Sequence, residues 1–484
     1  MSDTNKLVEW RDKNLNSISK SFCAAKWYNA SLHLGHGFTN SCHLPLPHPI
    51  DKEEIKTNPS ALHNTEMKKR QRKMMLEGKR PAECSYCWKV EDIGRNNIAD
   101  RVYKSQIYSE ADIARLKDLP WDADINLKTV EVSFDRTCNF ACSYCNAGYS
   151  TAWAKDIETN GPYQKFKTQS AGAYYSDGSW ADKFGKYNDN NPYVQAFIDW
   201  WPELVQDLEE LRVTGGEPSA SHNFWNFLEV MKKYPSDKLR LAVNSNLGGN
   251  FKRIQRLIDA SHELPIKEFD LYTSNEALGA HAEYIRDGLL YDEWRRNMVA
   301  FIENAKFRSL TIMMTINSLC LFSITEFMDD MLVLKRKYGP NRPNLDFNIL
   351  RWPAFMSPLS LPAEHKMFLH NKIKGWFDER KQDEDFEQMF SINEQAQIQR
   401  MIDYIEVVKT GHVTTESDFP KHAHDFKSFY EQYDKRRGKD FKKTFPELAV
   451  WYDSIGVDNT IPDVVVTNGE ITHFEDGEYQ SNDQ

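Results

Sequence analysis

The sequence predicts an α/β fold with a parallel sheet, because strand-like and helix-like segments alternate between residues 129 and 352. Units of about thirty residues leave room for the right-handed crossovers that join parallel strands. Periodicity alone leaves open whether the six units curl into a partial barrel or form an open sheet. Strands are expected at 129–135, 210–214, 238–246, 266–274, 309–317 and 345–352. Helices are expected at 222–234, 251–264, 282–305 and 323–339.

The regions around this repeat differ from it in composition. Residues 1–110 look irregular and hold four of the eight cysteines, so we expect a Cys-rich unit there and the repeat at 126–355. The repeat carries an insertion at about 150–200, rich in Gly, Ser, Asn, Asp and Tyr, which is either a functional lid or a solvated loop. Charged and aromatic helices predict a helical extension at 356–470, followed by a polar, acidic and flexible tail at 471–484.

Composition excludes some classes of protein. The 484 residues carry a net charge of −10, which argues against non-specific binding to nucleic acid phosphates. No apolar run is long enough for a membrane span, and the first thirty residues lack the pattern of a signal peptide, so we expect a cytoplasmic protein without a membrane partner. In a reducing compartment the eight cysteines are expected to be metal ligands or buried thiols.

Three cysteines follow the first predicted strand closely. Cys138, Cys142 and Cys145 form a C-x3-C-x2-C loop at the carboxyl end of that strand, where the site of a parallel α/β protein is usually found. Three thiolates on a short loop can hold three irons of a cubane cluster. The fourth iron then stays open for a substrate or cofactor, much as a catalytic zinc keeps a free position.

The loop, with Tyr144 before its last cysteine, resembles the signature of the radical S-adenosylmethionine (radical SAM) enzymes. The sequence TGGEP, containing Gly215, Gly216 and Glu217 after the second strand, resembles the family's GGE motif. The resemblance spans roughly residues 128–355 and implies a partial (βα)6 TIM-like barrel. It also implies a 4Fe-4S cluster whose open iron chelates S-adenosylmethionine, reductive cleavage of this cofactor, and a 5′-deoxyadenosyl radical that abstracts hydrogen from a substrate.

The resemblance also implies roles for individual residues. Glu217 would pair with the cofactor's ammonium, and glycines let the backbone approach a ligand; the structural alternative is an ordinary turn. Residues 348–352 would flank the adenine, or the apolar members of this segment would face the core. The family's common serine–aspartate–glycine pattern is absent, which weakens the carboxylate assignment. The remaining candidates are Asn244, Ser245 and Asn246 for the ribose or carboxylate, or as caps of the next helix, and Ser274 and Arg286 for the carboxylate.

The other cysteines of the front half form a second candidate site. The spacing of Cys84 and Cys87 is typical of metal knuckles, and Cys23 and Cys42 complete a set of four. This order resembles the auxiliary-cluster modules called twitch or SPASM domains, although those usually follow the barrel. An auxiliary iron–sulfur cluster, a zinc ion and the absence of a joint site all stay open. Alternative ligands are His33, His36, His43 and His48, each otherwise an ordinary histidine; Cys320, on an apolar strand, is expected to be a buried thiol.

The leading hypothesis is a radical SAM oxidoreductase that resembles maturases and acts on a peptide or protein side chain. A low-potential ferredoxin or flavodoxin would supply electrons, because such clusters reach potentials of roughly −700 mV. A nucleotide or sugar substrate is the alternative within the enzyme class. Two further hypotheses are a zinc-stabilised binding protein without catalysis and a relative of these enzymes that binds the cofactor without cleaving it.

Overall fold

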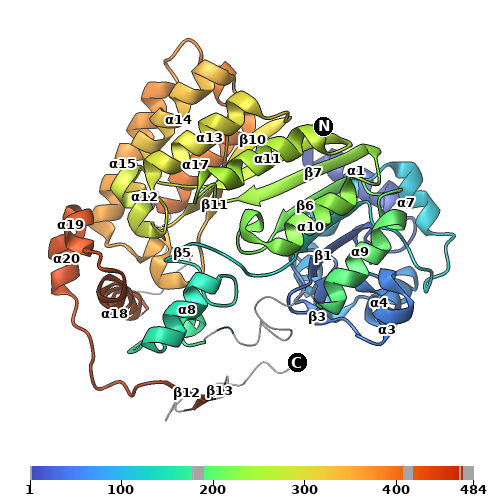
Figure 1. The fold of residues 1–484 in the computed structure, drawn as a ribbon, viewed down its shortest axis with the longest axis horizontal. Coiled ribbons are helices and arrows are strands. Elements are labelled where there is room, and N and C mark those ends of the chain that lie inside the picture. The colour runs from blue at the N-terminus through green and yellow to red at the C-terminus, as the bar shows by residue number, and fades with distance from the viewer. Residues whose placement is uncertain (1–2, 177, 179–189, 407–417, 468–469, 473–484) are drawn as a thin grey trace.

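The computed structural model describes residues 3–176, 178, 190–406, 418–467 and 470–472 (Figure 1). The described part of the tail predicted at 471–484 belongs to a two-stranded ladder, and the rest of that tail lies outside the described residues. In the described part of the chain, no helix has the length and apolar character needed to cross a membrane. The ladder consists of β12 (Val465–Thr467) and β13 (Glu470–Thr472).

A nine-stranded sheet forms the centre of the molecule, and its strand order is β11-β10-β8-β7-β6-β4-β1-β2-β3. The six strands of the predicted repeat are all present and pair in parallel in their chain order, so the predicted α/β class and partial barrel are confirmed. The sheet ends at β11 on one side and β3 on the other, and does not close. These six strands are β4 (Thr129–Ser133), β6 (Glu210–Thr214), β7 (Ser236–Ser245), β8 (Ile266–Ser274), β10 (Ser309–Ile316) and β11 (Asn344–Ile349).

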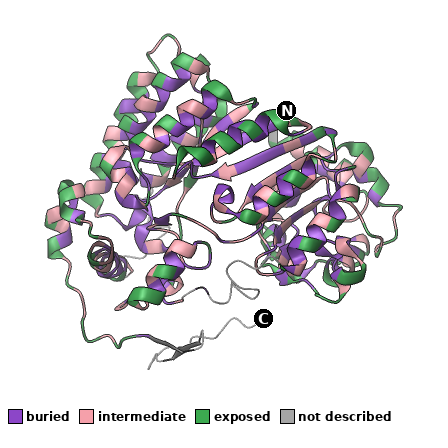
Figure 2. Ribbon diagram, in the orientation of Figure 1, coloured by how far each residue is buried: buried purple, intermediate pink, exposed green. Residues whose placement is uncertain are grey.

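Amphipathic helices connect these strands and bury their apolar side chains in one large core shared with the sheet. Figure 2 shows the helices with buried inner faces and exposed outer faces. The helices are α9 (Pro192–Leu204), α10 (His222–Met231), α11 (Phe251–Glu263), α13 (Tyr291–Asn304) and α14 (Ile324–Tyr338).

The prediction of a single helix at 282–305 is wrong, because the helical conformation is interrupted near the middle of this segment. Helix α12 (Gly279–Ile285) ends at a two-residue strand, β9 (Arg286–Asp287), before α13 begins. Gly288 has φ +101°, a conformation that favours glycine and ends the helical path. β9 pairs antiparallel with β5 (Ala141–Cys142), which lies inside the cysteine loop. A long-range contact thus overrides a local helical pattern.

The first hundred residues are not irregular, contrary to the prediction. Strand β1 (Asn29–His33) pairs in parallel with β4 and extends the central sheet, and β2 (Phe38–Asn40) and β3 (His48–Pro49) continue it. The sequence of β1, NASLH, is short and polar, so it lacks the usual apolar strand signal. A second apolar core forms around Phe22, Trp27 and Trp88. The helices here include α1 (Asp3–Asn14), α2 (Ala25–Tyr28), α3 (Glu54–Thr57), α4 (Glu66–Leu76), α5 (Ser85–Asp92), α6 (Asp100–Gln106) and α7 (Glu110–Leu116).

The predicted C-terminal helices are present, and one of them contacts the insertion. Helix α18 (Phe419–Arg437) lies beside α8 (Thr151–Asn160) of the insertion (Figure 1). Cys320 is fully buried, as predicted, but it lies in a 3-10 turn, Cys320–Phe322, rather than on a strand. The other helices of this region are α15 (Ala363–Arg380), α16 (Phe386–Met389), α17 (Ile392–Glu406), α19 (Phe441–Thr444) and α20 (Ala449–Ser454).

Candidate functional site

A pocket of about 230 Å³, partly open to solvent, lies at the carboxyl ends of the parallel strands. It gathers residues from the loops or ends of β4, β6, β7, β8 and β10, although they are far apart in the sequence. Of the residues predicted for the cluster and the cofactor, Glu217 and residues 348–352 are missing from its lining. The lining residues are Cys138, Phe140, Cys142, Tyr144, Cys145, Tyr149, Thr214, Gly215, Gly216, Asn244, Ser245, Asn246, Ser274, Arg286 and Thr315.

The cysteine loop is fixed by backbone pairing with the segment after β8. Cys142 stands opposite Arg286 in the β5–β9 ladder, and the N–H of Ser143 donates to the carbonyl of Ile285 at 2.7 Å. Burial raises the pKa of all three thiols, to about 12 for Cys145. A buried thiol becomes a thiolate readily only when a cation or metal compensates its charge. The chemistry of this donor set therefore fits an iron–sulfur cluster.

Three aromatic side chains bind three successive carbonyls of this loop. The hydroxyl of Tyr433 donates to Ala141 at 3.5 Å, the indole N–H of Trp153 donates to Cys142 at 2.9 Å, and the hydroxyl of Tyr174 donates to Ser143 at 2.8 Å. These donors come from α18, from α8 and from the 3-10 turn Gln169–Tyr174. The insertion and the C-terminal extension thus hold the loop on its outer side.

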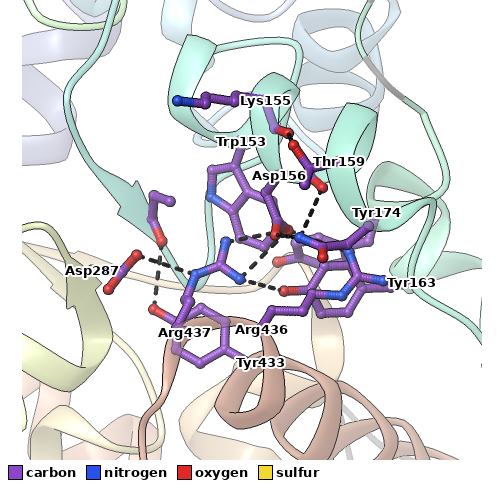
Figure 3. A network of polar contacts seen from close by, with 12 residues as sticks. Trp153, Lys155, Asp156, Thr159, Tyr163, Tyr174, Asp287, Tyr433, Arg436 and Arg437 are labelled. Atoms are coloured by element: carbon purple, nitrogen blue, oxygen red, sulfur yellow. Dashed lines mark hydrogen bonds and ion pairs between the residues drawn. The ribbon is translucent and has the colours of Figure 1, made fainter.

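Arg437 connects these elements to one another (Figure 3). Its guanidinium pairs with Asp156 of α8 at 3.4 Å and with Asp287 of β9 at 3.2 Å, and donates to the hydroxyl of Tyr163 at 2.7 Å. It also lies over the ring of Trp153, 4.5 Å from the ring centre. Because Asp287 adjoins Arg286, a single buried cation links α18, the insertion and the ladder that carries Cys142.

The two glycines of TGGEP allow the loop after β6 to approach the start of the cysteine loop. Gly215 has φ +122°, and a Cβ there would lie 2.7 Å from the carbonyl oxygen of Asp135. A Cβ on Gly216 would lie 2.4 Å from the carbonyl oxygen of Thr137. Larger residues would therefore displace the backbone just before Cys138.

Glu217 lies behind the pocket, where protein groups engage both of its carboxylate oxygens. One oxygen accepts from the hydroxyl of Ser245 at 2.7 Å and from the N–H of Ser219 at 3.0 Å, and the other accepts from the N–H of Asn246. Burial raises the pKa of Glu217, and these hydrogen bonds lower it by a smaller amount. In this arrangement Glu217 joins the loop after β7 to the loop after β6.

Asn244 presents an unused acceptor at the pocket. Its Oδ1 is buried and has no hydrogen-bond partner among the described residues, although the residue lines the cavity. A buried acceptor without a donor is costly, so a donor on a bound molecule would stabilise it. The side chain of Asn246 instead donates to Asn139 at 3.1 Å, whereas Ser274 lines the pocket at the end of β8. Oδ1 of Asn244 is therefore suited to accept a hydrogen bond from a ligand that carries a donor group.

Sequence reasoning missed Glu276, the partner of two predicted residues. Its carboxylate accepts from Nε of Arg286 at 3.0 Å and from the hydroxyl of Tyr144 at 3.1 Å. Burial lowers the pKa of Arg286, but Glu276, Tyr144 and Cys142 raise it by more, so the guanidinium is charged. Thr315 and Tyr149 also line the pocket and were missed. The one available signal was the position of Glu276, two residues after the end of β8.

The four other cysteines predicted to bind metal line a second pocket. Burial raises the pKa of Cys84 and Cys87 to about 12 and also raises that of Cys42. None of the four candidate histidines is among the described residues that line it. The structure thus places Cys23, Cys42, Cys84 and Cys87 along the lining of one pocket.

Within the described ranges of the chain, no three His, Cys, Asp or Glu side chains form a group that could hold a metal ion. The thiols of each pocket line a cavity instead of converging on one point. In an iron–sulfur cluster the cysteines bind separate irons, whereas in a zinc site the thiolates lie about 2.3 Å from one shared ion.

Comparisons with known proteins give a partial structural likeness. No family model matches the chain, and no curated protein matches it. Among solved structures, it is similar to native anSMEcpe with bound AdoMet, at 14% identity and a TM-score of 0.32, over 51% of this chain and 58% of that chain. It is also similar to native anSMEcpe with bound AdoMet and the Cp18Cys peptide, at 14% identity and a TM-score of 0.33, over 52% of this chain and 60% of that chain. The chain thus spans about three fifths of the length of these structures.

Proposed function

We propose that the chain is a cytoplasmic radical SAM enzyme. One observation carries the proposal: the C-x3-C-x2-C loop meets Gly215, Gly216, Asn244, Ser274 and Arg286 in one pocket at the carboxyl edge of a parallel sheet. A zinc-stabilised binding protein needs no polar residues from four further strands around its cysteines. An enzyme that must hold a polar cofactor beside a cluster does need them.

In this proposal the three thiols of the loop hold a 4Fe-4S cluster and leave one iron without a protein ligand. When bound, the cluster and S-adenosylmethionine supply a one-electron cleavage to methionine and a 5′-deoxyadenosyl radical, which takes hydrogen from the substrate. Asn244 accepts a hydrogen bond from the cofactor through its unpaired Oδ1. Arg286 and Ser274 face the cofactor's carboxylate, and Glu276 and Tyr144 orient the Arg286 guanidinium.

Glu217 and the aromatic donors have supporting parts in this proposal. Glu217 fixes the strand-end loops that carry Gly216 and Asn246, through its hydrogen bonds to the backbone and to Ser245. The buried rings of Trp153 and Tyr433 cover the loop and keep water from it. The protein's contribution is therefore orientation and exclusion of water, while the cofactor supplies the reactivity.

We also propose that the four N-terminal cysteines hold an auxiliary iron–sulfur cluster in a twitch- or SPASM-like unit at residues 1–110. The radical SAM barrel would span 126–355, with its insertion at about 150–200 and the helical extension at 356–470. Four thiols lining one cavity support this proposal. Zinc bound to the same four thiols is the alternative, and iron and zinc analysis separates the two.

The proposed substrate is a peptide or protein side chain, by resemblance to enzymes with auxiliary clusters, and the proposed electron donor is a ferredoxin or flavodoxin. A nucleotide or sugar is the alternative substrate. Deuterium transfer from labelled candidates into 5′-deoxyadenosine distinguishes these classes, because only the true substrate donates its hydrogen.

Anaerobic purification followed by reduction tests the proposed function. We expect brown protein containing iron and sulfide, and 5′-deoxyadenosine when dithionite and S-adenosylmethionine are added. C142A should lose this product, whereas C320A, which changes a buried cysteine outside both pockets, should keep it. Colourless protein containing zinc would favour the binding protein, and brown protein without the product would favour a relative that binds the cofactor without cleaving it.

A further inference from the structure

The two cysteine pockets lie at opposite edges of the central sheet. Cys138 follows β4 at its carboxyl end, whereas Cys23 precedes β1, whose first residue, Asn29, pairs with Thr129 at the amino end of β4. Asn29 also donates through its side chain to the carbonyl of Ser41, next to Cys42. At about 3.3 Å per residue, the paired segments alone separate these edges by roughly 15 Å. The cofactor, and the substrate atom that reacts beside it in the first pocket, are therefore out of reach of the second set of thiols.

Two fully buried cations lie on α4 and contact the segments that carry the second pocket, although neither of them lines it. The ammonium of Lys68 donates to the hydroxyl of Thr39 at 2.7 Å and to the carbonyl of Asn40 at 3.2 Å, two residues before Cys42. The guanidinium of Arg72, one turn further along α4, donates to the carbonyl of Lys26 at 3.3 Å and to Oδ1 of Asn64 at 3.0 Å. Their other contacts are the ring nitrogens of His63 and the carbonyl of Ala123.

Neither cation has a carboxylate within ion-pair distance among the residues that the structure describes. The other buried cations here do: Lys26 pairs with Glu83, and Arg101 pairs with Glu91 at 2.7 Å. A buried charge without a counter-charge is strongly unfavourable. Burial and the neighbouring cations accordingly hold the pKa of Lys68 well below its usual value. Burial likewise lowers the pKa of Arg72 to about 9. Both side chains would therefore keep their positive charge readily only beside a negative group, and the four thiols lie on the same side of the fold.

Four thiolates around an iron–sulfur core leave a net negative charge, which is the counter-charge that this region lacks. One-electron reduction makes such a centre more negative, so nearby buried cations stabilise the reduced form more than the oxidised form. Their effect is large only where water does not screen it, as at these fully buried positions.

We propose that Lys68 and Arg72 are the counter-charges of an anionic centre on Cys23, Cys42, Cys84 and Cys87, and that they raise its reduction potential. Because this centre lies across the sheet from the cofactor pocket, it exchanges electrons and does not ligate the substrate. The inference rests on the auxiliary cluster of the proposed function. It assigns to Lys68 and Arg72 a role in positioning charge and no part in catalysis.

The test isolates the second centre in the full-length C138A/C142A/C145A variant. Iron, sulfide and zinc are measured first, and the potential is then determined by titration with dithionite, followed by visible absorption and electron paramagnetic resonance. K68Q retains a side-chain donor for Asn40 but removes the charge, so we expect a more negative potential. K68R keeps the positive charge and should leave the potential unchanged. K73Q, which changes an exposed lysine of the same helix, should also leave the potential unchanged. Where K68Q does not fold, R72Q must shift the potential in the same direction.

An unchanged potential in K68Q, or an equal shift in K73Q, would overturn the proposal, as would zinc in place of iron. Cleavage of S-adenosylmethionine by the unmodified enzyme is measured separately. Loss of the predicted shift with cleavage intact contradicts this inference alone. A shift without cleavage contradicts the proposed reaction but leaves the charge assignment standing.

Discussion

Cys142 and Arg286 are 144 positions apart in the chain, yet they pair across the short β5–β9 ladder, where a guanidinium nitrogen of Arg286 lies 3.8 Å from the thiol sulfur. The contact brings a buried cation to the loop proposed to hold the cluster. Glu276, in the loop between β8 and α12, balances this cation. The loop therefore has a defined electrostatic environment before any ligand binds.

R286Q is expected to destabilise the protein and to weaken cofactor binding. It leaves Glu276 buried without its partner, and breaking a buried ion pair costs about 3–5 kcal/mol. Urea unfolding measures the free-energy change, and calorimetry measures the affinity for S-adenosylmethionine. The matched R286Q/E276Q variant removes both charges and should recover most of the stability but not the affinity. Equal affinity in R286Q and the unmodified protein would contradict the assigned contact with the carboxylate.

G216A is expected to lower the iron content of the first site. The added methyl group would lie 2.4 Å from the carbonyl oxygen of Thr137, so the chain before Cys138 must move. G375A is the control: it adds the same group on exposed α15, where no atom lies within 4 Å, and should stabilise the protein by about 0.5–1 kcal/mol. Iron analysis after anaerobic reconstitution checks the expectation. Full iron content in G216A would show that the close approach is unimportant.

R437M is expected to speed the loss of iron in air. The substitution removes the ion pairs with Asp156 and Asp287 and the hydrogen bond to Tyr163, and so loosens the elements that donate to the cysteine loop. The loss of stability should be about 1–3 kcal/mol, because Asp156 and Asp287 are partly exposed and keep Arg436 and Lys439 as partners. K435M, two residues earlier on the exposed side of α18, is the control. The decay of visible absorption after exposure to air is the measurement, and equal decay in both variants would contradict the role of Arg437.

Because of the buried His48, the folded protein is expected to lose stability on acidification. Burial and the charges of Lys68 and Lys26 lower its pKa to about 3, so the folded chain keeps it neutral while the unfolded chain protonates it below about pH 6.5. The unfolded state then binds more protons, and the free energy of unfolding falls as the pH decreases from 6.5 toward 3, by at most about 1.4 kcal/mol per pH unit. H48Q should reduce this slope, and H262Q, at an exposed histidine on α11, should not. Urea unfolding of the three proteins at several pH values provides the comparison.

The local sequence pattern was sufficient to predict the strands of the repeat and to recognise the spacing of the cysteine loop. The apolar strands 129–135, 238–246 and 309–317 are each recognisable within ten residues, and parallel pairing follows from the helices between them. The spacing of Cys138, Cys142 and Cys145 is likewise a property of one short segment. The strand predictions succeeded because the physical signal lies close together in the chain, and the prediction of a cluster on the cysteine loop depends on the same kind of local signal.

The tertiary structure alone decided which groups face the pocket and which hold it in place. Glu217 looked like a ligand-binding residue but is turned toward Ser245, and Glu276, without any motif, holds Arg286. Helix 282–305 is interrupted because β9 pairs with a loop more than 140 residues away, and β1 joins the sheet despite its polar sequence. Contacts between distant segments determine burial and pairing, and the free energy of such contacts is not encoded in any local pattern of residues.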